Sequence, residues 1–469
     1  MTSKNIGRVL LGGVALAVLS TGAQADELSQ LKAQLEALQA QVNQLEARPA
    51  APTLPEGASW ITFRRGTEAT ADWNTARAGD YIPSSSGVTI AITPSADLPA
   101  PVHEVTISGY VKGDVIYDFD QDLGDLFSYT AINGRDDQEH IRLHARQTRF
   151  NIKSKSDTAI GQIRTLIEGD FFSGGSFGST DWRMRHAWGE WDMTPNWTFG
   201  AGQTWTNFMS PFTGITTVDF NGDIGLIGAS RNAQVRLAWH DGPMLFAVAA
   251  EHPRDSWLLT DFGNSSSNIP DFTARWQYDA PGGHKFLISG VLRNYHTDSS
   301  LGGSSESELG WGVQGAVNIN LADIATLTTA VIYGDGIGGY IFGANRGAYY
   351  DGFTGDIETI ESMGIFAGLI FNVTDTTSIN LGWGYTDQSR SDLLDASWVT
   401  GRYDQNVDIM SAHANIIWQP VQQLRLGWEV MWAERQRTVP VFDPAGTLVD
   451  AGTRTDDALR AQFGAWFYF

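Results

Sequence analysis

From about residue 104 onward, the chain is a series of short segments in which every second residue is apolar. In the stretch EVTISGYVKGDVIYDF at 104–119, Val and Ile residues alternate with Glu, Thr, Ser, Lys and Asp over most of the length. A period of two residues with one apolar face predicts a β-strand. About sixteen such segments occur, each near the length that crosses a bilayer when tilted. They lie at 104–119, 139–154, 158–173, 182–193, 196–209, 231–241, 243–252, 269–280, 283–296, 307–320, 323–335, 358–373, 376–388, 407–419, 422–436 and 457–469.

The connections between these segments differ in length on the two sides of the series. Links after even-numbered segments are brief, whereas most links after odd-numbered segments are long. The long ones lie at 120–138, 210–230, 253–268, 297–306, 335–357, 389–406 and 437–456. This difference is typical of an outer-membrane barrel, and a soluble β-sandwich, the alternative, gives no reason for it. The sequence therefore predicts an all-β fold, a 16-stranded antiparallel transmembrane β-barrel over 104–469, with both ends on the short-turn side.

Residues 1–25 have the three parts of a secretory signal peptide. Lys4 and Arg8 are basic, residues 9–19 form an apolar run, and Ala-Gln-Ala at 23–25 offers a cleavage site. The run is too short to span a bilayer, which disfavours the alternative of a retained anchor. We expect export to the bacterial outer membrane. Because the chain has no cysteine, no disulfide bond stabilises it.

Residues 26–48 carry a heptad repeat that ends at Pro49. The apolar positions are Leu28, Leu31, Leu35, Leu38, Val42 and Leu45. A seam this narrow does not stabilise a lone helix in water, so the repeat predicts a short α-helical coiled coil that joins copies of the chain. The even strand count places it in the periplasm. An amphipathic helix docked on the chain's own barrel is the alternative.

Residues 49–103 form a separate region in which Pro, Ser and Ala are frequent. That composition is typical of a loose linker. The central stretch ASWITFRRGTEATADW has apolar and aromatic residues that a linker does not need, so a small plug or docking element is the second interpretation. The sequence leaves both open.

The chain is acidic. Its formal charge is −22, and loss of Lys4 and Arg8 with the signal peptide makes it −24, which argues against nucleic acid as a partner. Much of the acidic surplus lies in predicted loops such as DFDQDLGD at 118–125, which we interpret as a solvated rim. Divalent cations that bridge these loops to the phosphates of outer-membrane lipid and lipopolysaccharide are an open alternative. No spacing resembles a calcium loop, so no metal or other cofactor is expected.

Basic residues share the inward parity of their strands in the first two-thirds of the barrel. They are Lys112, Arg142, Arg164, Arg183, Arg185, Arg236, Arg275 and Arg293, and a one-residue bulge would add Arg146 and Arg149. Glu168, Asp170 and Glu429 also point inward. One interpretation is that structural ion pairs keep the barrel open. The other is a positively charged ladder, facing lumen water, that draws anions through the pore.

The connection at 210–230 has an unusual composition. The stretch SPFTGITTVDFNGDIGLIGA at 210–229 is partly apolar and rich in glycine. Loops of this kind can fold inward instead of extending into solvent. We therefore predict a constriction loop that narrows the pore, with Asp219, Phe220 and Asn221 near its tip.

An enzyme in a membrane barrel is a competing hypothesis, and it needs a nucleophile, a base and an orienting acid close together. The histidines are scattered along the chain, and no Gly-x-Ser-x-Gly motif occurs. We therefore expect no catalytic residues. A structural anchor, in which the coiled coil grips the cell wall, and a general non-selective porin are further alternatives.

Several stretches resemble the DcaP-like porins of Gram-negative outer membranes. They are SGYVKGDVIYDFDQDLGD, ARQTRFNIKS, RHAWGEWD followed by GQTWTNFM, TVDFNG, PDFTARWQYDAPGG with SGVLRNY, and YGDGIGGYI. They are spread in a consistent order across most of 104–469. The resemblance implies a homotrimer of sixteen-stranded barrels with an N-terminal periplasmic coiled coil, and a preference for small anions such as dicarboxylates and aromatic acids. Residues 49–103 depart from the family pattern, being longer and richer in proline.

Overall fold

The computed structural model of the chain describes residues 59–66, 86–94, 101–134, 138–174, 180–228, 231–253, 258–259, 264–265, 268–298, 305–350 and 354–469. Contacts divide the chain into two compact units, one of residues 1–59 and 94–99 and one of residues 60–93 and 100–469. The first unit lies almost entirely outside the described residues, as do the predicted signal peptide and coiled coil. No helix in the described ranges is long and apolar enough to cross a membrane.

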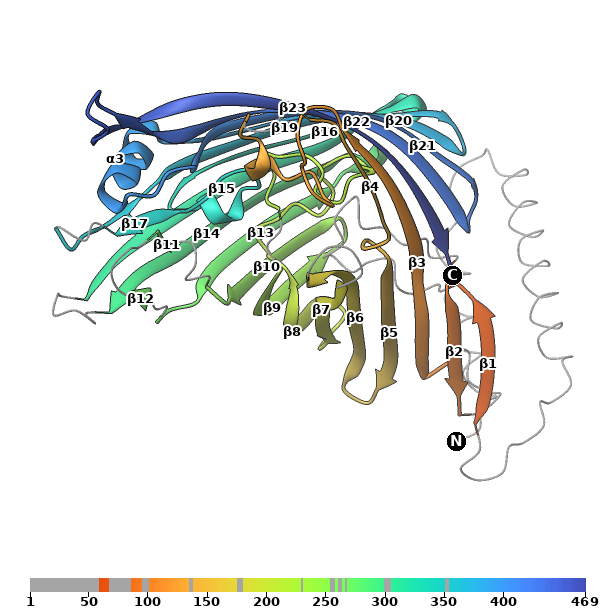
Figure 1. The fold of residues 1–469 in the computed structure, drawn as a ribbon. Helices are drawn as coiled ribbons and strands as arrows, with labels where there is room; N and C mark the ends of the chain where they lie inside the picture. Colours follow the sequence, from red (N-terminus) through yellow and green to blue (C-terminus); the bar gives the residue numbers. More distant parts are fainter. Residues whose placement is uncertain are drawn as a thin grey trace, which may run out of the picture. The chain divides into compact units, whose positions relative to one another are not determined.

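The second unit is a closed antiparallel barrel of sixteen strand positions, as predicted (Figure 1). In ring order its strands are β3 (His103–Asp118), β4 (His140–His144) continued by β5 (Arg149–Thr158), β6 (Gly161–Gly174), β7 (Thr180–Asp192), β8 (Trp197–Trp205), β9 (Arg231–Asp241), β10 (Met244–Glu251), β13 (Asp271–Asp279), β14 (Lys285–Asp298), β15 (Glu306–Leu321), β16 (Ala325–Asp335), β19 (Glu361–Thr374), β20 (Thr377–Gln388), β21 (Asn406–Val421), β22 (Leu424–Phe442) and β23 (Leu448–Tyr468). The ring closes where β23 pairs with β3, from Arg460 opposite Asp118 to Tyr468 opposite Tyr110.

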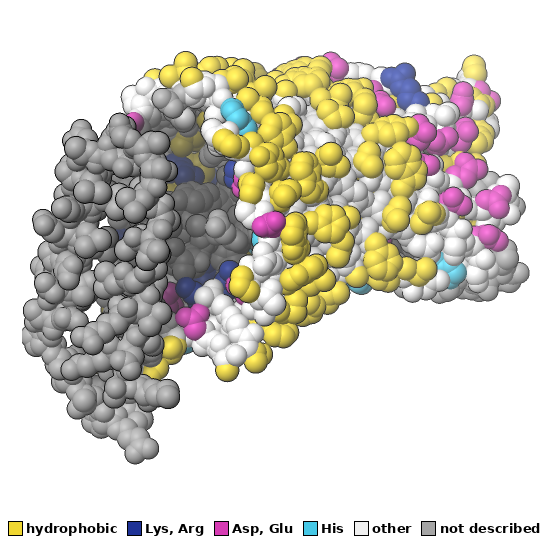
Figure 2. All heavy atoms as spheres, turned by 180° about the vertical axis from the view of Figure 1, so that it is seen from behind, with side chains coloured by type: hydrophobic (Ala, Val, Ile, Leu, Met, Phe, Trp, Pro, Cys, Tyr) yellow, Lys and Arg dark blue, Asp and Glu magenta, His cyan; other side chains and the backbone are white. Residues whose placement is uncertain are grey.

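Side chains alternate between the outer surface and the lumen along each strand. In β3, Val111 and Val115 are exposed outside, whereas Lys112 and Asp114 are buried inside. Figure 2 shows hydrophobic side chains over the outer wall and acidic side chains gathered at one end. An apolar outer band around a polar interior is the surface that a lipid bilayer requires of a barrel.

The two ends of the barrel differ as predicted. At one end the turns span five residues or fewer, at 159–160, 193–196, 242–243, 280–284, 322–324, 375–376 and 422–423. The other end carries most of the longer connections. The prediction of a long loop at 437–456 is wrong. Strands β22 and β23 extend into this range and pair with each other, which leaves a turn at 443–447.

The long-loop end holds further structure that the sequence did not predict. Helix α3 (Arg390–Thr400) lies in the connection between β20 and β21. The short strands β11 (Leu258–Leu259), β17 (Ala348–Tyr350) and β18 (Ile357–Thr359) form a separate small sheet. Strand β12 (Asn264–Ser265) pairs with the end of β14.

The bulge predicted between Arg146 and Arg149 is a longer interruption. A turn at 145–148 separates β4 from β5. Arg146 contacts Asp125 inside the barrel, and Arg149 is buried. The interruption thus turns both arginines inward, which is the effect that we expected of a bulge.

Two strands from the region 49–103 extend the barrel wall. β1 (Trp60–Arg65) pairs with β2 (Val88–Thr93), and β2 pairs with the first residues of β3. On β3 this pairing ends at Ile107, just before the point where the Phe469 N–H donates to the Gly109 carbonyl at 3.2 Å. Figure 1 shows the hairpin running beside β3 near the C-terminus of the chain. The β1–β2 hairpin therefore occupies the edge of β3 that β23 does not reach.

Candidate functional site

The constriction loop lies inside the barrel and follows its inner wall. Inward side chains of successive strands bind its backbone: Thr328 of β16 accepts from the Gly214 N–H at 3.2 Å, and Asn415 of β21 donates to the Thr216 carbonyl at 2.8 Å. Polar residues at the inward positions of these strands supply the partners that a buried loop backbone needs.

The tip of the constriction loop is anchored by buried charges. Glu429 accepts from the backbone N–H groups of Val218 and Asp219 at 2.9 and 3.0 Å. Arg460 forms an ion pair with Asp219 at 3.2 Å, and the Lys112 ammonium donates to the Val218 carbonyl at 2.6 Å. Hydrogen bonds to ionised groups are stronger than neutral ones, so these contacts fix the height and direction of the tip.

Beyond Asp219, the loop extends along the wall toward β6. The Phe220 ring lies 4.4 Å from the ring of Phe172 on β6. The Asn221 side chain donates to the Phe127 carbonyl at 2.9 Å, and the Phe127 N–H donates to Asp219. Phe127 belongs to the connection after β3, so two loops pack together inside the lumen.

A third connection, between β16 and β19, completes this group of loops. The Phe342 carbonyl accepts from the Gly225 N–H at 3.0 Å. Gly225 has a φ of +76°, and a Cβ there would lie 2.2 Å from the Ile365 carbonyl, so the position requires glycine. A polar recess of about 500 Å³ lies among the loops, lined in part by Tyr129, Asn221 and Arg346.

Arginines of β7 face the tip and pair with carboxylates of β6. Arg183 holds both oxygens of Asp170 at 2.9 and 2.8 Å, and Arg185 bonds Glu168 at 2.9 Å and Asp170 at 3.1 Å. Arg149 lies 3.6 Å from Glu168. The guanidinium carbons of Arg183 and Arg185 are 5.2 and 5.6 Å from the Phe220 ring centroid. Cations, carboxylates and an aromatic ring therefore share one cluster.

The predicted cations nearer the two ends also have partners. At the long-loop end, Arg142 bonds Asp122 and Asp125 at 2.7 and 3.0 Å, and Arg146 bonds Asp125 at 2.5 Å. At the short-turn end, Arg164 contacts Glu190 and Asp192, each at 2.9 Å.

The remaining predicted cations are buried beneath loops. Lys112 pairs with Asp114 at 2.7 Å, and Arg293 lies 3.9 Å from Asp271. Arg236 donates to the Trp205 carbonyl and to Gln234, and Arg275 donates to the Met209 carbonyl. Lys112, Arg149, Arg185, Arg236, Arg275 and Arg293 are all buried, so the expectation that they face open water does not hold for this group.

The paired charges differ in how far they are exposed. The side chain of Arg183 is 31% exposed, whereas that of its partner Asp170 is 0% exposed. Arg146 is likewise more exposed than Asp125. In the Arg183–Asp170 pair the carboxylate thus lies beneath the guanidinium, whereas in the Arg142–Asp122 pair the carboxylate is the more exposed group.

Residues 91–443 match the family model described as DcaP outer membrane protein. The chain belongs to the DcaP outer membrane protein family. Among solved structures, the barrel is similar to the crystal structure of the outer membrane channel DcaP of Acinetobacter baumannii, with 22% identity, a TM-score of 0.66, and coverage of 78% of this chain and 97% of that one. It is also similar to an anion-selective porin from Comamonas acidovorans, with 12% identity, a TM-score of 0.51, and coverage of 78% and 100%. A search of curated proteins found no match.

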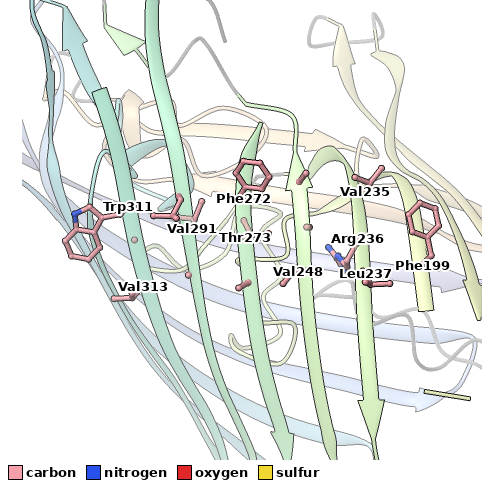
Figure 3. A pocket seen from close by; sticks show the side chains of 16 residues that line it. Phe199, Val235, Arg236, Leu237, Val248, Phe272, Thr273, Val291, Trp311 and Val313 are labelled. Carbon is pink, nitrogen blue, oxygen red and sulfur yellow. The ribbon is translucent and has the colours of Figure 1, made fainter. Parts of the chain in front are cut away.

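An apolar concavity of about 680 Å³ lies on the outer wall of this DcaP-family barrel (Figure 3). It spans β8 to β15, and exposed rings of Phe199, Phe272 and Trp311 border it. Because its lining is apolar and the exposed side chains belong to the outer face, we assign it to the lipid surface and not to the solute path. The residues that the structure describes contain no cluster of side chains suited to a metal ion.

Sequence reasoning assigned Glu168 and Asp170 to the lumen but missed the carboxylates that the end of β3 and the connection after it supply to other arginines. Asp118, Asp122 and Asp125 lie in the acidic stretch that we interpreted as a solvated rim. The structure instead places them against arginines, Asp118 at 2.6 Å from Arg460 and the other two against Arg142. Strand alternation alone does not show that a loop turns inward, so these three pairs could not be predicted from it.

Acid is expected to loosen the connection between β3 and β4, which contains Asp122 and Asp125. Burial would raise the pKa values of Asp122 and Asp125, but hydrogen bonds from Gly124, Arg142 and Arg146 and the nearby charges of Arg142, His140 and His144 outweigh it, so both pKa values are lowered. A group with a lowered pKa stabilises the folded state above its unfolded pKa and loses that contribution as the pH falls through the folded value. Single-channel current noise should therefore rise only below about pH 4. A rise already near about pH 6 would assign the effect to histidine and contradict this prediction.

Proposed function

We propose that the chain is a passive diffusion channel of the outer membrane that prefers small anionic solutes, including dicarboxylates and aromatic acids. Family membership and the barrel fold support the channel. The exposed guanidinium of Arg183 above the buried carboxylate of Asp170 carries the proposal of anion preference. Charges in a narrow lumen with low-dielectric walls act strongly on a solute, whereas acidic side chains at the rim are screened within roughly 8–10 Å by salt.

The neighbours of Arg183 suit an aromatic acid. Its Nε and Nη2 hold Asp170, and the remaining N–H groups of the guanidinium can donate to a second carboxylate. The rings of Phe172 and Phe220 lie within 5.6 Å of its guanidinium carbon, and both residues are partly exposed. An aromatic acid can therefore present its carboxylate to Arg183 and its ring to Phe220 at the same position.

We also propose that the chain forms a homotrimer, with the predicted coiled coil in the periplasm and outer-membrane lipid and lipopolysaccharide around the barrels. The heptads at 28–45 support self-association. The number three comes from the resemblance to the DcaP-like porins. The channel and its anion preference do not depend on this number.

Replacing Arg183 with glutamine is expected to shift selectivity toward cations. The change removes the most exposed guanidinium of the cluster, while Arg185 still holds Asp170 at 3.1 Å and limits damage to the fold. The measurement is the reversal potential across a planar bilayer in a salt gradient, from which the anion-to-cation permeability ratio should fall severalfold.

The matched control is Arg454→Gln, because Arg454 is a half-exposed arginine at the long-loop end that pairs with Asp456 at 2.9 Å. It makes the same change in net charge outside the lumen and should leave the reversal potential unchanged. A wild-type channel that prefers potassium over chloride would refute the anion preference. The arginines would then act as structural pairs, which is the other interpretation of the sequence.

A further inference from the structure

We infer that the outer face of the β1–β2 hairpin is a contact surface for a second copy of the chain. The inference rests on the proposed self-association. Residues paired directly across antiparallel strands point to the same side, so Phe63, opposite Ile90, and Ile61, opposite Ile92, share the outer face of β3. Phe63 is 72% and Ile61 is 57% exposed. The hairpin therefore presents an apolar outer face that nothing in the described residues covers.

The inner face of the hairpin is polar. Arg64 bonds Glu104 of β3 at 2.7 Å, and Thr89 shares a hydrogen bond of 2.8 Å with Thr106. Apolar outside and polar inside is the pattern of the barrel wall itself. The hairpin is thus a continuation of the wall, and most of it precedes the family match, which starts at residue 91 within β2.

The open edge of β1 restricts what can cover this face. Within the described residues, β1 pairs with β2 alone, so the other edge has backbone N–H and carbonyl groups to satisfy. Lipid chains offer them no hydrogen bonds. Water does, but it would leave the Phe63 and Ile61 side chains exposed, which is unfavourable. A protein surface can satisfy the edge and cover the apolar face together.

The adjacent outer wall indicates that the protein surface belongs to another copy. Ser154 of β5 and Thr165 of β6 point outward and share a hydrogen bond of 2.6 Å, and His103 bonds Ser156 at 2.6 Å. Outward polar side chains suit a protein contact better than lipid. The wall from β8 to β15, in contrast, is apolar and concave (Figure 3). The wall next to the hairpin thus carries outward polar pairs among apolar side chains such as Ile152 and Ile167, whereas the wall from β8 to β15 has no such pair among the residues that line its concavity.

The order of the chain identifies the partner. The predicted coiled coil has its last apolar position at Leu45, and β1 begins at Trp60, so fourteen residues separate them. A coiled coil formed by the heptads would therefore hold copies of the chain together close to the start of β1. A second copy is therefore the protein surface that the chain itself brings to the hairpin.

The test uses the absence of cysteine, which allows a single spin label at any chosen residue. Full-length protein in lipid nanodiscs carries the label at Phe63→Cys. Phe246→Cys, exposed on the outer face of β10, gives the reference for lipid, and Ala445→Cys, in the exposed β22–β23 turn, gives the reference for water. Ile61→Cys replaces Phe63→Cys if the latter does not insert.

At position 63 we expect collision rates with oxygen and with a water-soluble nickel chelate to be severalfold below both references. We also expect a dipolar coupling between copies at a shorter distance than at position 246, which disappears when labelled chains are diluted with unlabelled ones. Oxygen access equal to position 246 would mean lipid, nickel access equal to position 445 would mean water, and protection without coupling would mean another part of the same chain. Each of these outcomes overturns the inference. Conductance of the same sample tests the channel separately.

Discussion

Glu429→Ala is expected to release the tip of the constriction loop and to raise the single-channel conductance. The buried Glu429 carboxylate accepts from the Val218 and Asp219 N–H groups and from Asn415 at 2.7 Å. Loss of the two backbone bonds costs about 3–6 kcal/mol of anchoring, at about 1.5–3 kcal/mol for each hydrogen bond to a charged group. A free-energy change of that size changes the ratio of anchored to released loop by about 100-fold or more. Planar-bilayer recording should show larger and noisier openings.

Glu434→Ala is the matched control for this variant. Glu434 lies on the same strand, β22, but on its outer face, so its replacement should leave the conductance unchanged. The retained gel shift of the folded barrel on heating would show that Glu429→Ala still folds. Wild-type conductance in a folded Glu429→Ala channel would mean that the tip is not what narrows the pore.

Arg460→Met is expected to lower the thermal stability of the barrel strongly. Arg460 is fully buried and joins Asp118 at 2.6 Å to Asp219 at 3.2 Å. Removing one partner of a buried ion pair typically costs about 3–5 kcal/mol, because the remaining charge is left uncompensated. Here two carboxylates are left. The measurement is the temperature at which the folded band disappears from an unheated gel series.

Two further variants test this prediction, one as a control and one as a partial rescue. Arg454→Met removes a half-exposed arginine from the same strand, β23, and should cost about 0–1 kcal/mol, as surface ion pairs do. Asp219→Asn combined with Arg460→Met removes one of the stranded charges and should recover part of the loss. Equal melting of Arg460→Met and the Arg454→Met control would contradict the buried-pair argument.

Strand alternation predicted the barrel and the inward direction of most of the arginines, but not every irregularity that turns some of them inward. Arg183 and Arg185 were both assigned to the lumen, and the structure places both inside, because a β-bulge near Arg185 shifts the register there. The unusual composition of 210–229 also predicted a loop inside the lumen, where the structure finds it. These features follow from local pattern, and local pattern is what a single sequence contains.

The partners of those residues could not be predicted in the same way. Asp219 meets Arg460 from 241 positions away, and no periodicity links the two. The β1–β2 hairpin was missed because its strands are six residues each and are separated by a long connection. Strand β23 was predicted to start at 457, whereas it starts at Leu448 because β22 pairs with it beyond the apolar band. The Asp219–Arg460 contact, the β1–β2 hairpin and the start of β23 all depend on pairing between separate segments, which local pattern does not contain.

The contacts of the constriction-loop tip have a consequence for folding. The tip binds Lys112 on β3 and Arg460 on β23, the first and last strands of the ring. These two strands come together only when the barrel closes, and contacts so distant in sequence form late and slowly. The loop can reach its final position only after that step. Placement of the loop tip and closure of the barrel are therefore expected to be one event.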